Sequence, residues 1–303
     1  MMSQLVPLKQ KIRSIQTTKK ITHAVRLVSM SLYNKLDKLN VPLQRYTKTI
    51  KDLFLDVLAH APEWKSPLLF PQDIFDSMPL YIVVSTSKGL CGSLNSNLLR
   101  YIEKSLFIEK QQAPQFIAIG QKSISFVKAG EFRSCISTTY PELTSNNFIA
   151  IADDLVDKIT KGGVHYSSVT FYTNEAKSFF VQRPYKFTLI PMSLDPMNHD
   201  DHKKVRADEV RLQEEDPVTN QPIWEQPQSD VLDFLSIRYL RSAIIHVLFQ
   251  ALRAEHAARF LAMENSTNNA EKYLERLTLQ FNKLRQSLIT KEVSELTSTF
   301  PTR

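Results

Sequence analysis

The sequence predicts an α/β fold, in which a long antiparallel coiled coil of the N- and C-terminal helices carries a central Rossmann-like α/β domain. Three observations support this prediction. Apolar residues recur at steps of three and four through the first sixty positions, and the same spacing returns in a stretch without Pro or Gly from Val231 to Leu296. Between them, short β-branched runs alternate with helical patterns. We therefore expect an N-terminal helix at 1–60, an α/β domain at 61–230 and a C-terminal helix at 231–303.

The N-terminal segment carries one predicted apolar stripe, which would form the seam of a coiled coil. Its members are Leu5, Leu8, Ile12, Ile15, Val28, Leu32, Leu36, Leu39, Leu43, Tyr46, Ile50, Leu53 and Val57. At 1.5 Å per residue, a helix from Leu5 to His60 would be about 80 Å long. Pro42 is expected to kink this helix, and Ala61-Pro62 to end it.

The C-terminal segment repeats the pattern over a length of order 100 Å. Its first seam consists of Leu240, Ile244, Val247, Ala251, Ala254, Ala258 and Leu261, and after a change of phase it continues at Leu274, Leu277, Phe281, Leu284 and Leu288. A polar stretch, Asn265 to Asn269, separates the two parts and is expected to set the register. Two such helices bury their seams most simply against each other, as an antiparallel pair.

The middle of the chain has the pattern of a small, mostly parallel sheet. Strands are predicted around 81–84, 116–119 and 169–172, and helices around 94–108 and 148–159. From Pro191 to Asp230 the sequence is polar and punctuated by proline, which indicates a long connector.

The composition is that of a globular protein and excludes several classes. The chain has a formal net charge of +7, 23% charged residues and 43% hydrophobic residues, and no apolar run approaches the roughly 20 residues of a membrane-spanning helix. Cys91 and Cys135 lie too far apart for a C-x-x-C pair, so we expect free thiols. With only six glycines, the chain has little room for phosphate-binding loops. The N-terminus resembles neither a signal peptide nor a presequence, and we expect a bacterial cytoplasmic setting.

Three segments together resemble the gamma subunit of F-type ATP synthases. The first runs from Ile12 to Ser29, and the second from Ser87 to Leu98, where Gly89-Leu90-Cys91-Gly92 and Asn95 match a signature of that family. The third comprises Glu255 to Arg259, Asn268 to Ala270 and Asn282 to Glu292. Departures from the family pattern include Ser87, Ser93, Lys291 and the long connector.

This resemblance implies a central-stalk rotor that performs no bond chemistry. Its partners would be three alpha and three beta subunits, the epsilon subunit and the c-ring. It would associate peripherally with the cytoplasmic side of a bacterial membrane through the complex alone. No catalytic, cofactor-binding or metal-binding residue is implied. The alternative is a gamma-derived coiled-coil adaptor or inhibitor that does not rotate, and an enzyme ranks third.

The resemblance also implies which residues contact the beta subunits. Arg285, Gln286 and Thr290 would make polar contacts with a beta-subunit loop, and ordinary exposed polarity is the alternative. On the first helix an acidic beta-subunit loop would meet basic side chains, for which a solvated face is the equally weighted alternative. These side chains are Lys9, Lys11, Arg13, Lys19, Lys20 and Arg26. Nucleic acid is a weaker candidate, because no interleaved aromatic platform accompanies the charges.

Gly89, Cys91, Gly92 and Asn95 are interpreted as a structural turn between a strand and a helix. The spacing fits neither G-x-x-x-x-G-K-[ST] nor G-x-G-x-x-G, so nucleotide binding is disfavoured. The run from His199 to His202 could be imagined as a metal site, but it lies in the polar connector without a scaffold, and a solvated loop is the favoured interpretation.

Overall fold

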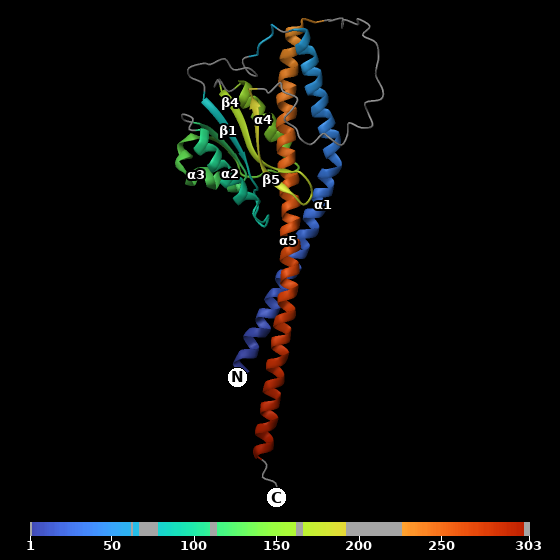
Figure 1. The fold of residues 1–303 in the computed structure, drawn as a ribbon, viewed down its shortest axis with the longest axis vertical. Coiled ribbons are helices and arrows are strands. Elements are labelled where there is room, and N and C mark those ends of the chain that lie inside the picture. Colours follow the sequence, from blue (N-terminus) through green and yellow to red (C-terminus); the bar gives the residue numbers. More distant parts are fainter. Residues whose placement is uncertain are drawn as a thin grey trace.

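The computed structural model describes residues 2–61, 63–66, 78–109, 114–161, 166–191 and 226–299. Two helices determine its shape: α1 (Met2–His60) with 59 residues and α5 (Gln228–Thr299) with 72 residues. They run antiparallel and cross, and the first residues of α1 and the last residues of α5 lie at the same far end, away from the α/β domain (Figure 1). At 1.5 Å per residue α5 is about 108 Å long.

The α/β domain is built on one five-stranded sheet of order β3-β2-β1-β4-β5. Its strands are β1 (Met78–Val84), β2 (Gln115–Ile119), β3 (Ile136–Tyr140), β4 (Tyr166–Ala176) and β5 (Gln182–Ile190). The first four are parallel to their neighbours, and β5 is antiparallel to β4. The helices are α2 (Leu94–Glu109), α3 (Gln121–Ala129) and α4 (Phe148–Lys161), with a 3₁₀ turn η1 (Glu131–Cys135). The prediction of a mostly parallel sheet is confirmed.

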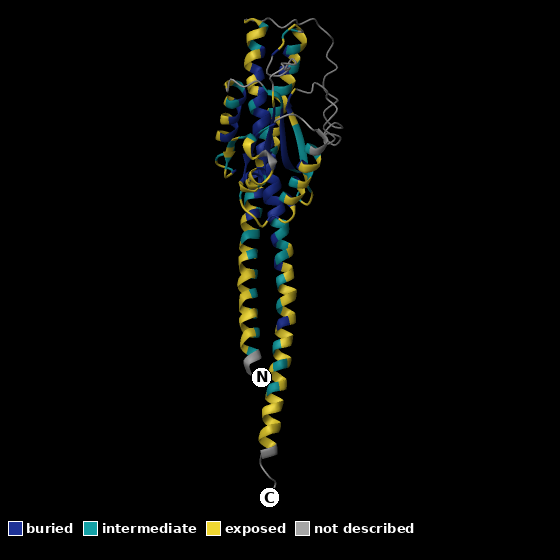
Figure 2. Cartoon of the chain, turned by 90° about the vertical axis from the view of Figure 1, so that its left-hand side faces the viewer, coloured by how far each residue is buried: buried dark blue, intermediate teal, exposed yellow. Residues whose placement is uncertain are grey.

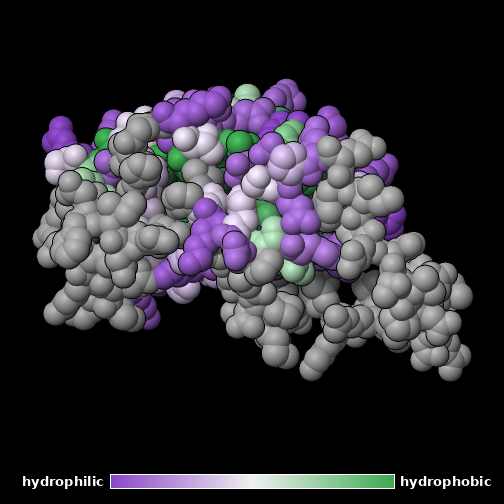
Figure 3. All heavy atoms as spheres, turned by 90° about the horizontal axis from the view of Figure 1, so that it is seen from above, coloured by the Kyte–Doolittle hydropathy of each residue, from purple (hydrophilic) through white to green (hydrophobic). Residues whose placement is uncertain are grey.

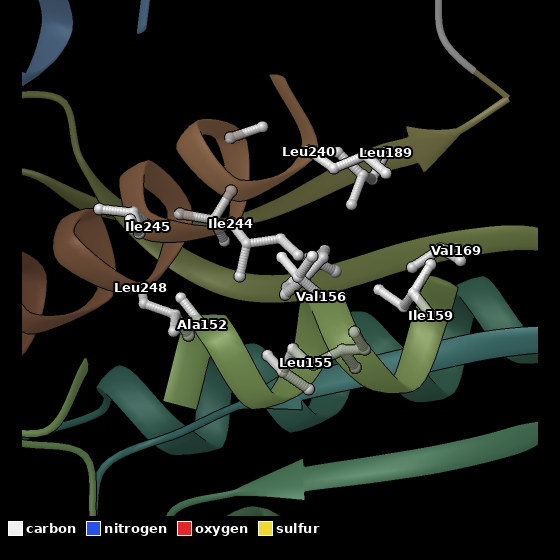
Figure 4. Close-up of a cluster of buried hydrophobic side chains, with 14 of the residues drawn as sticks. Ala152, Leu155, Val156, Ile159, Val169, Leu189, Leu240, Ile244, Ile245 and Leu248 are labelled. Carbon is white, nitrogen blue, oxygen red and sulfur yellow. The ribbon is translucent and has the colours of Figure 1, made fainter. Parts of the chain in front are cut away.

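The sheet is buried on both faces, which explains why its central strand is a continuous apolar run. Leu80, Ile82 and Val84 of β1 pack in the cluster that contains α4 and α5. The alternate residues Tyr81 and Val83 pack in a second cluster with α2 and α3. Figure 4 shows the first cluster, in which side chains of α4 and α5 gather with Val169 of β4 and Leu189 of β5. The long helix α5 is thus part of the core of the domain.

The predicted seam of the C-terminal helix is confirmed. Ile244, Val247, Ala254 and Ala258 are buried, and so is Leu277 beyond the polar stretch. The buried face from Leu240 to Arg259 extends well beyond a two-helix seam, because α5 contacts α1 on one side and the domain on the other.

The predicted seam of α1 is wrong in its middle section. Val28, Leu39, Tyr46 and Leu53 are exposed, with 59%, 51%, 46% and 45% of their surface accessible. The observed seam alternates steps of four and three without a break and consists of Ile15, Lys19, Thr22, Arg26, Ser29, Tyr33, Leu36, Asn40, Leu43, Thr47, Ile50, Phe54 and Val57. Several of its members are polar. The apolar pattern alone therefore predicts neighbours that lie one position away from these polar seam residues.

The ends of the long helices follow the prediction closely. Helix α1 ends at His60, as the proline at position 62 predicts, and its helical assignment continues through Pro42 without interruption. Helix α5 begins at Gln228, three residues before the predicted start. The residues of α3, β3 and β5 were not assigned individually from the sequence. Most of the connector, including His199 to His202, lies outside the described residues.

Candidate coupling surfaces of the helical pair

The helical pair changes character where it leaves the α/β domain. At the level of the domain α5 is dark blue in Figure 2, whereas both helices beyond it are mostly exposed. This projecting part holds all the basic and polar residues that the sequence assigned to partner contacts, from Lys9 to Arg26 on α1 and from Arg285 to Thr290 on α5.

Two of the predicted contact residues are engaged within the chain. The Lys19 ammonium lies 2.7 Å from a carboxylate oxygen of Glu271, and its hydrogen bond lowers the pKa of that carboxyl. Arg26 forms an ion pair with Glu264. These pairs join α1 to α5, so Lys19 and Arg26 hold the two helices in register in addition to any partner role.

The polar stretch at 265–269 belongs to the same junction. Thr267 is buried, and its hydroxyl donates a hydrogen bond of 2.9 Å to the hydroxyl of Thr22 on α1. With the flanking ion pairs it forms a polar section of the seam, which we call the polar junction: Lys19, Thr22, Arg26, Glu264, Thr267 and Glu271. Polar seam positions specify register at some cost in stability.

The other basic side chains of α1 form an outward stripe. Lys9, Arg13 and Lys20 are exposed and lie at i, i+4 and i+11, which places them on one helical face. Among the described residues they enter no ion pair. Lys11 differs, because its ammonium lies over the ring of Tyr273 on α5, 5.4 Å from the centroid. We call Lys9, Arg13 and Lys20 the basic stripe.

Arg285, Gln286 and Thr290 are exposed near the far end of α5. The Thr290 hydroxyl donates to the Gln286 carbonyl oxygen at 3.0 Å, which is an ordinary helical back-bond. Their side chains therefore remain available to a partner, and the assigned role stays a prediction.

The turn after β1 lies against α5 in the described structure. The Asn95 side chain closes it by accepting from the Thr86 amide at 3.2 Å and donating to the Thr86 hydroxyl at 2.7 Å. Cys91 is buried in a small cluster with Leu94 and Ala258. Asn95 also donates to the Cys91 sulfur at 3.2 Å.

The two glycines of this turn have different roles. Gly92 has φ +61°, in the left-handed region that favours glycine, and lies close to Ala262 of α5. Gly89 has no such φ, and an added Cβ there would meet nothing within 4 Å. The second left-handed residue is instead Leu90, with φ 65°. The left-handed backbone of this turn therefore lies at positions 90 and 92, and not at Gly89.

Arg259 of α5, which belongs to the third family segment, anchors the turn, and the sequence does not predict this role. Its guanidinium donates to the carbonyl oxygens of Gly89 and Lys88 at 3.3 and 3.5 Å, and it forms an ion pair with Glu255 one helical turn earlier. Both charged side chains are about nine-tenths buried. The signal in the sequence was an i, i+4 pair of opposite charges within an apolar stretch.

Known proteins resemble this chain over nearly its whole length. A profile of the ATP synthase family matches residues 4–301. An ATP synthase gamma chain of Francisella tularensis subsp. tularensis (strain WY96-3418) is 29% identical over 307 residues, which cover 98% of each chain. The chain of subspecies novicida (strain U112) gives the same identity and coverage. This chain belongs to the ATP synthase gamma family.

Solved structures share the fold of this gamma-family chain. The rotor of Euglena gracilis mitochondrial ATP synthase in rotational state 1 has a TM-score of 0.60, at 14% identity over 95% of this chain and 100% of that one. The central stalk and c-ring structure of Tetrahymena thermophila has a chain with a TM-score of 0.56, at 18% identity over 81% and 98%. Both confirm a paired-helix architecture with an α/β domain.

A modest cavity of the gamma-family chain lies between the turn, the β4–β5 hairpin and α5. Its volume is about 200 Å³, and carboxamides of Asn97, Asn174, Gln182 and Asn265 contribute to its lining. This is smaller than the roughly 300 Å³ at which small-molecule sites begin. Across the described residues, no group of three or more His, Cys, Asp or Glu is placed to hold a metal ion, and no helix has the length and hydropathy to cross a bilayer.

Burial of His256 predicts a loss of stability in acid. Desolvation and the nearby Arg259 lower the pKa of this imidazole from 6.5 to about 4. The folded state therefore favours neutral His256, and this contribution is complete above pH 6.5 and is lost as the pH falls towards 4. The difference corresponds to about 3 kcal/mol. Urea unfolding between pH 7 and 4 should show a smaller decrease for His256→Gln than for the wild type.

Glu255 has an opposite effect on the pH dependence of stability, and the experiment must separate it from that of His256. Burial raises the pKa of Glu255, and its ion pair with Arg259 opposes the rise in part. A raised carboxyl pKa contributes stability at low pH that is lost as the pH rises through the folded-state value, so it acts against the His256 effect. The comparison of His256→Gln with the wild type cancels this contribution. Parallel pH profiles of the two proteins would contradict the His256 assignment.

Proposed function

We propose that this chain is the central-stalk rotor of a bacterial F-type ATP synthase. It would turn inside a ring of three alpha and three beta subunits and couple ion-driven rotation to ATP synthesis at the ring's nucleotide sites. The observation that carries the proposal is the projecting helical pair, which extends from the α/β domain with a polar, largely exposed surface. An isolated stalk of this length without a partner is unusual for a globular chain.

Asymmetry of the projecting part supports a mechanical role. Helix α1 has no acidic residue before Asp37, so its projecting half is uniformly basic, whereas α5 beyond Asn265 carries both signs. A shaft can bias the state of a neighbouring site only through a difference in contact energy between its conformations. The basic side formed by α1 and the mixed side formed by α5 would therefore face different beta subunits at any angle of the shaft.

The α/β domain and the end of the helical pair near His60 would provide the docking surface for the epsilon subunit and the c-ring. Seen from the His60 end, the described surface is mainly hydrophilic with scattered apolar residues (Figure 3). The chain would be held peripherally on the cytoplasmic side of the membrane through these partners. ATP chemistry would take place in the ring, without catalytic residues on this chain.

Assembly with cognate partners tests the rotor proposal. Native mass spectrometry of the chain mixed with its alpha and beta subunits should give one copy per three alpha and three beta. A bead attached to the α/β domain should then rotate when ATP is added. Assembly without rotation would favour the adaptor or inhibitor. Failure of the folded chain to join folded alpha and beta subunits would contradict the rotor.

The basic stripe is expected to accelerate docking to an acidic partner surface. Neutralising it with Lys9→Gln, Arg13→Gln and Lys20→Gln should lower the association rate with the alpha/beta ring by about tenfold at low salt, and should flatten the dependence of that rate on ionic strength. Stopped-flow fluorescence measures both quantities. The charge-matched control Lys104→Gln, Lys122→Gln and Lys128→Gln alters exposed residues of the α/β domain. Equal slowing in both triple variants would show that net charge, and not the stripe, matters.

A further inference from the structure

The β4–β5 hairpin reaches beyond the sheet and ends beside both long helices (Figure 1). At its tip the Phe179 ring meets the Tyr33 ring of α1 edge-on, with centroids 4.8 Å apart. The same ring meets Phe260 of α5, with centroids 5.1 Å apart. One side chain of the α/β domain thus contacts both helices where they leave the domain.

The hairpin tip is not explained by its own turn chemistry. Ser178 and Val181 exchange two backbone hydrogen bonds of 3.3 Å, which leaves a two-residue loop of Phe179 and Phe180. Such loops favour residues with positive φ, typically Asn-Gly. Neither phenylalanine has a positive φ. Packing of Phe179 between the helices therefore contributes to holding this loop in place.

The contact matters because the two helices are attached to the domain differently. Helix α5 packs directly on the sheet, whereas α1 makes its extensive contact with α5, and its residues Leu36, Phe54 and Val57 join the same buried cluster. The ion pairs of Lys19 and Arg26 hold α1 on α5, and a contact from the hairpin adds a direct link between the domain and α1. Phe179 contacts α1 at Tyr33, which is 7% exposed.

Tyr33 is itself held by a polar group of α5. The Arg253 guanidinium lies over the Tyr33 ring, 5.7 Å from its centroid, and donates to the Asp37 carboxylate at 2.7 Å. Arg253 also donates to Gln250 at 3.0 Å. Phe179 therefore contacts a Tyr33 side chain whose ring is also held in place by Arg253.

We propose that Phe179 is a positioning residue that locks the helical pair to the α/β domain, so that the two turn as one body. This inference rests on the proposed rotor function. The ring of Phe179 opposes rotation of α1 around α5 at the point where the two helices leave the α/β domain. It thereby raises the torsional stiffness between the domain and the projecting part of the helical pair.

Phe180 provides a matched control in the adjacent position. Its side chain is 73% exposed, and its ring centroid lies 5.2 Å from that of Phe179. Among the described residues, no ring contact joins Phe180 to either long helix. Phe179→Ala and Phe180→Ala remove the same atoms from the same loop. Phe179→Tyr keeps the ring and should restore the wild-type behaviour.

The test uses the complex assembled with cognate alpha and beta subunits. A bead is attached through Lys122→Cys on the exposed surface of α3, in a Cys135→Ser background, and its angular fluctuation is recorded while the motor is stalled. Phe179→Ala should assemble, hydrolyse ATP and show a wider angular distribution. Phe180→Ala and Phe179→Tyr should match the wild type. Amide exchange at Val181 should be about tenfold faster in Phe179→Ala, because two aromatic contacts are lost.

Two results would overturn the proposal. One is an unchanged angular distribution in Phe179→Ala despite faster exchange at Val181, which would make the contact local to the hairpin. The other is an equal change in Phe179→Ala and Phe180→Ala. If Phe179→Ala does not assemble, Phe179→Leu supports the same comparison. A wild-type chain that assembles without rotating would contradict the rotor function instead, and is recognised before any variant is compared.

Discussion

Replacement of Gly120 by alanine is expected to prevent the α/β domain from folding stably. Gly120 connects β2 to α3 with φ +90°, where side chains are rarely tolerated, and an added Cβ would lie 2.2 Å from the carbonyl oxygen of Ser85. That oxygen belongs to the backbone at the end of β1, so it cannot rotate away. We expect a loss of about 4 kcal/mol or more in the free energy of unfolding.

The contacts around Gly120 explain why the backbone cannot yield. Its amide donates to the Tyr140 carbonyl oxygen at 2.8 Å, and the Ser85 amide donates to the Ile119 carbonyl oxygen at 2.8 Å. The Ser85 hydroxyl in turn accepts from the Ser123 amide at 2.7 Å. These bonds join the carboxyl ends of three parallel strands, so a shift at Gly120 would break them together.

Gly89→Ala is the matched control for this experiment. An added Cβ there meets no atom within 4 Å, and its φ lies outside the left-handed region. Urea unfolding followed by circular dichroism should show a strongly lowered midpoint, or no cooperative transition, for Gly120→Ala and a change within about 0.5 kcal/mol for Gly89→Ala. Similar midpoints for Gly120→Ala and the wild type would contradict the close approach of these strands.

Glu255→Ala is expected to have the second largest effect. It would leave the Arg259 guanidinium, 11% exposed, without its carboxylate partner in a buried position. Removing one member of a buried ion pair typically costs about 3–5 kcal/mol, because an uncompensated charge remains in the interior. The turn after β1 would be destabilised as well, since Arg259 donates to the carbonyl oxygens of Lys88 and Gly89.

Two comparisons make the Glu255 experiment specific. Asp157→Ala removes a partner from the exposed pair with Lys161, whose side chains are 60% and 75% accessible, and should change stability by a few tenths of a kcal/mol. The double variant Glu255→Leu with Arg259→Leu removes both charges and should be less destabilised than Glu255→Ala. Any loss that remains in the double variant measures the anchoring of the turn. Equal midpoints for Glu255→Ala and Asp157→Ala would contradict the buried pair.

The architecture could be predicted because its signals are local and repeated. Seam spacing over tens of residues identifies a long helix, and its match at both ends of the chain implies an antiparallel pair. The continuous apolar run of β1 likewise predicts a strand buried on both faces. Strands β3 and β5 lie at the two edges of the sheet and are mostly half-buried, so they lack the continuous apolar run of the central strands. Helix α3 has nine residues, too few for its periodicity alone to assign it.

The sequence predicts which residue types the site contains, but it does not predict which of them pair within the chain and which face outward. The sequence determined that α1 carries basic side chains at 9, 13, 19, 20 and 26, and that polar residues interrupt the seam of α5. The tertiary structure alone decided that Lys19 and Arg26 pair with Glu271 and Glu264, while Lys9, Arg13 and Lys20 face outward. The reason is that a polar residue at a seam position has the same local signature as one on a solvated face. Its partner lies more than two hundred residues away, and only the register of two packed helices brings them together.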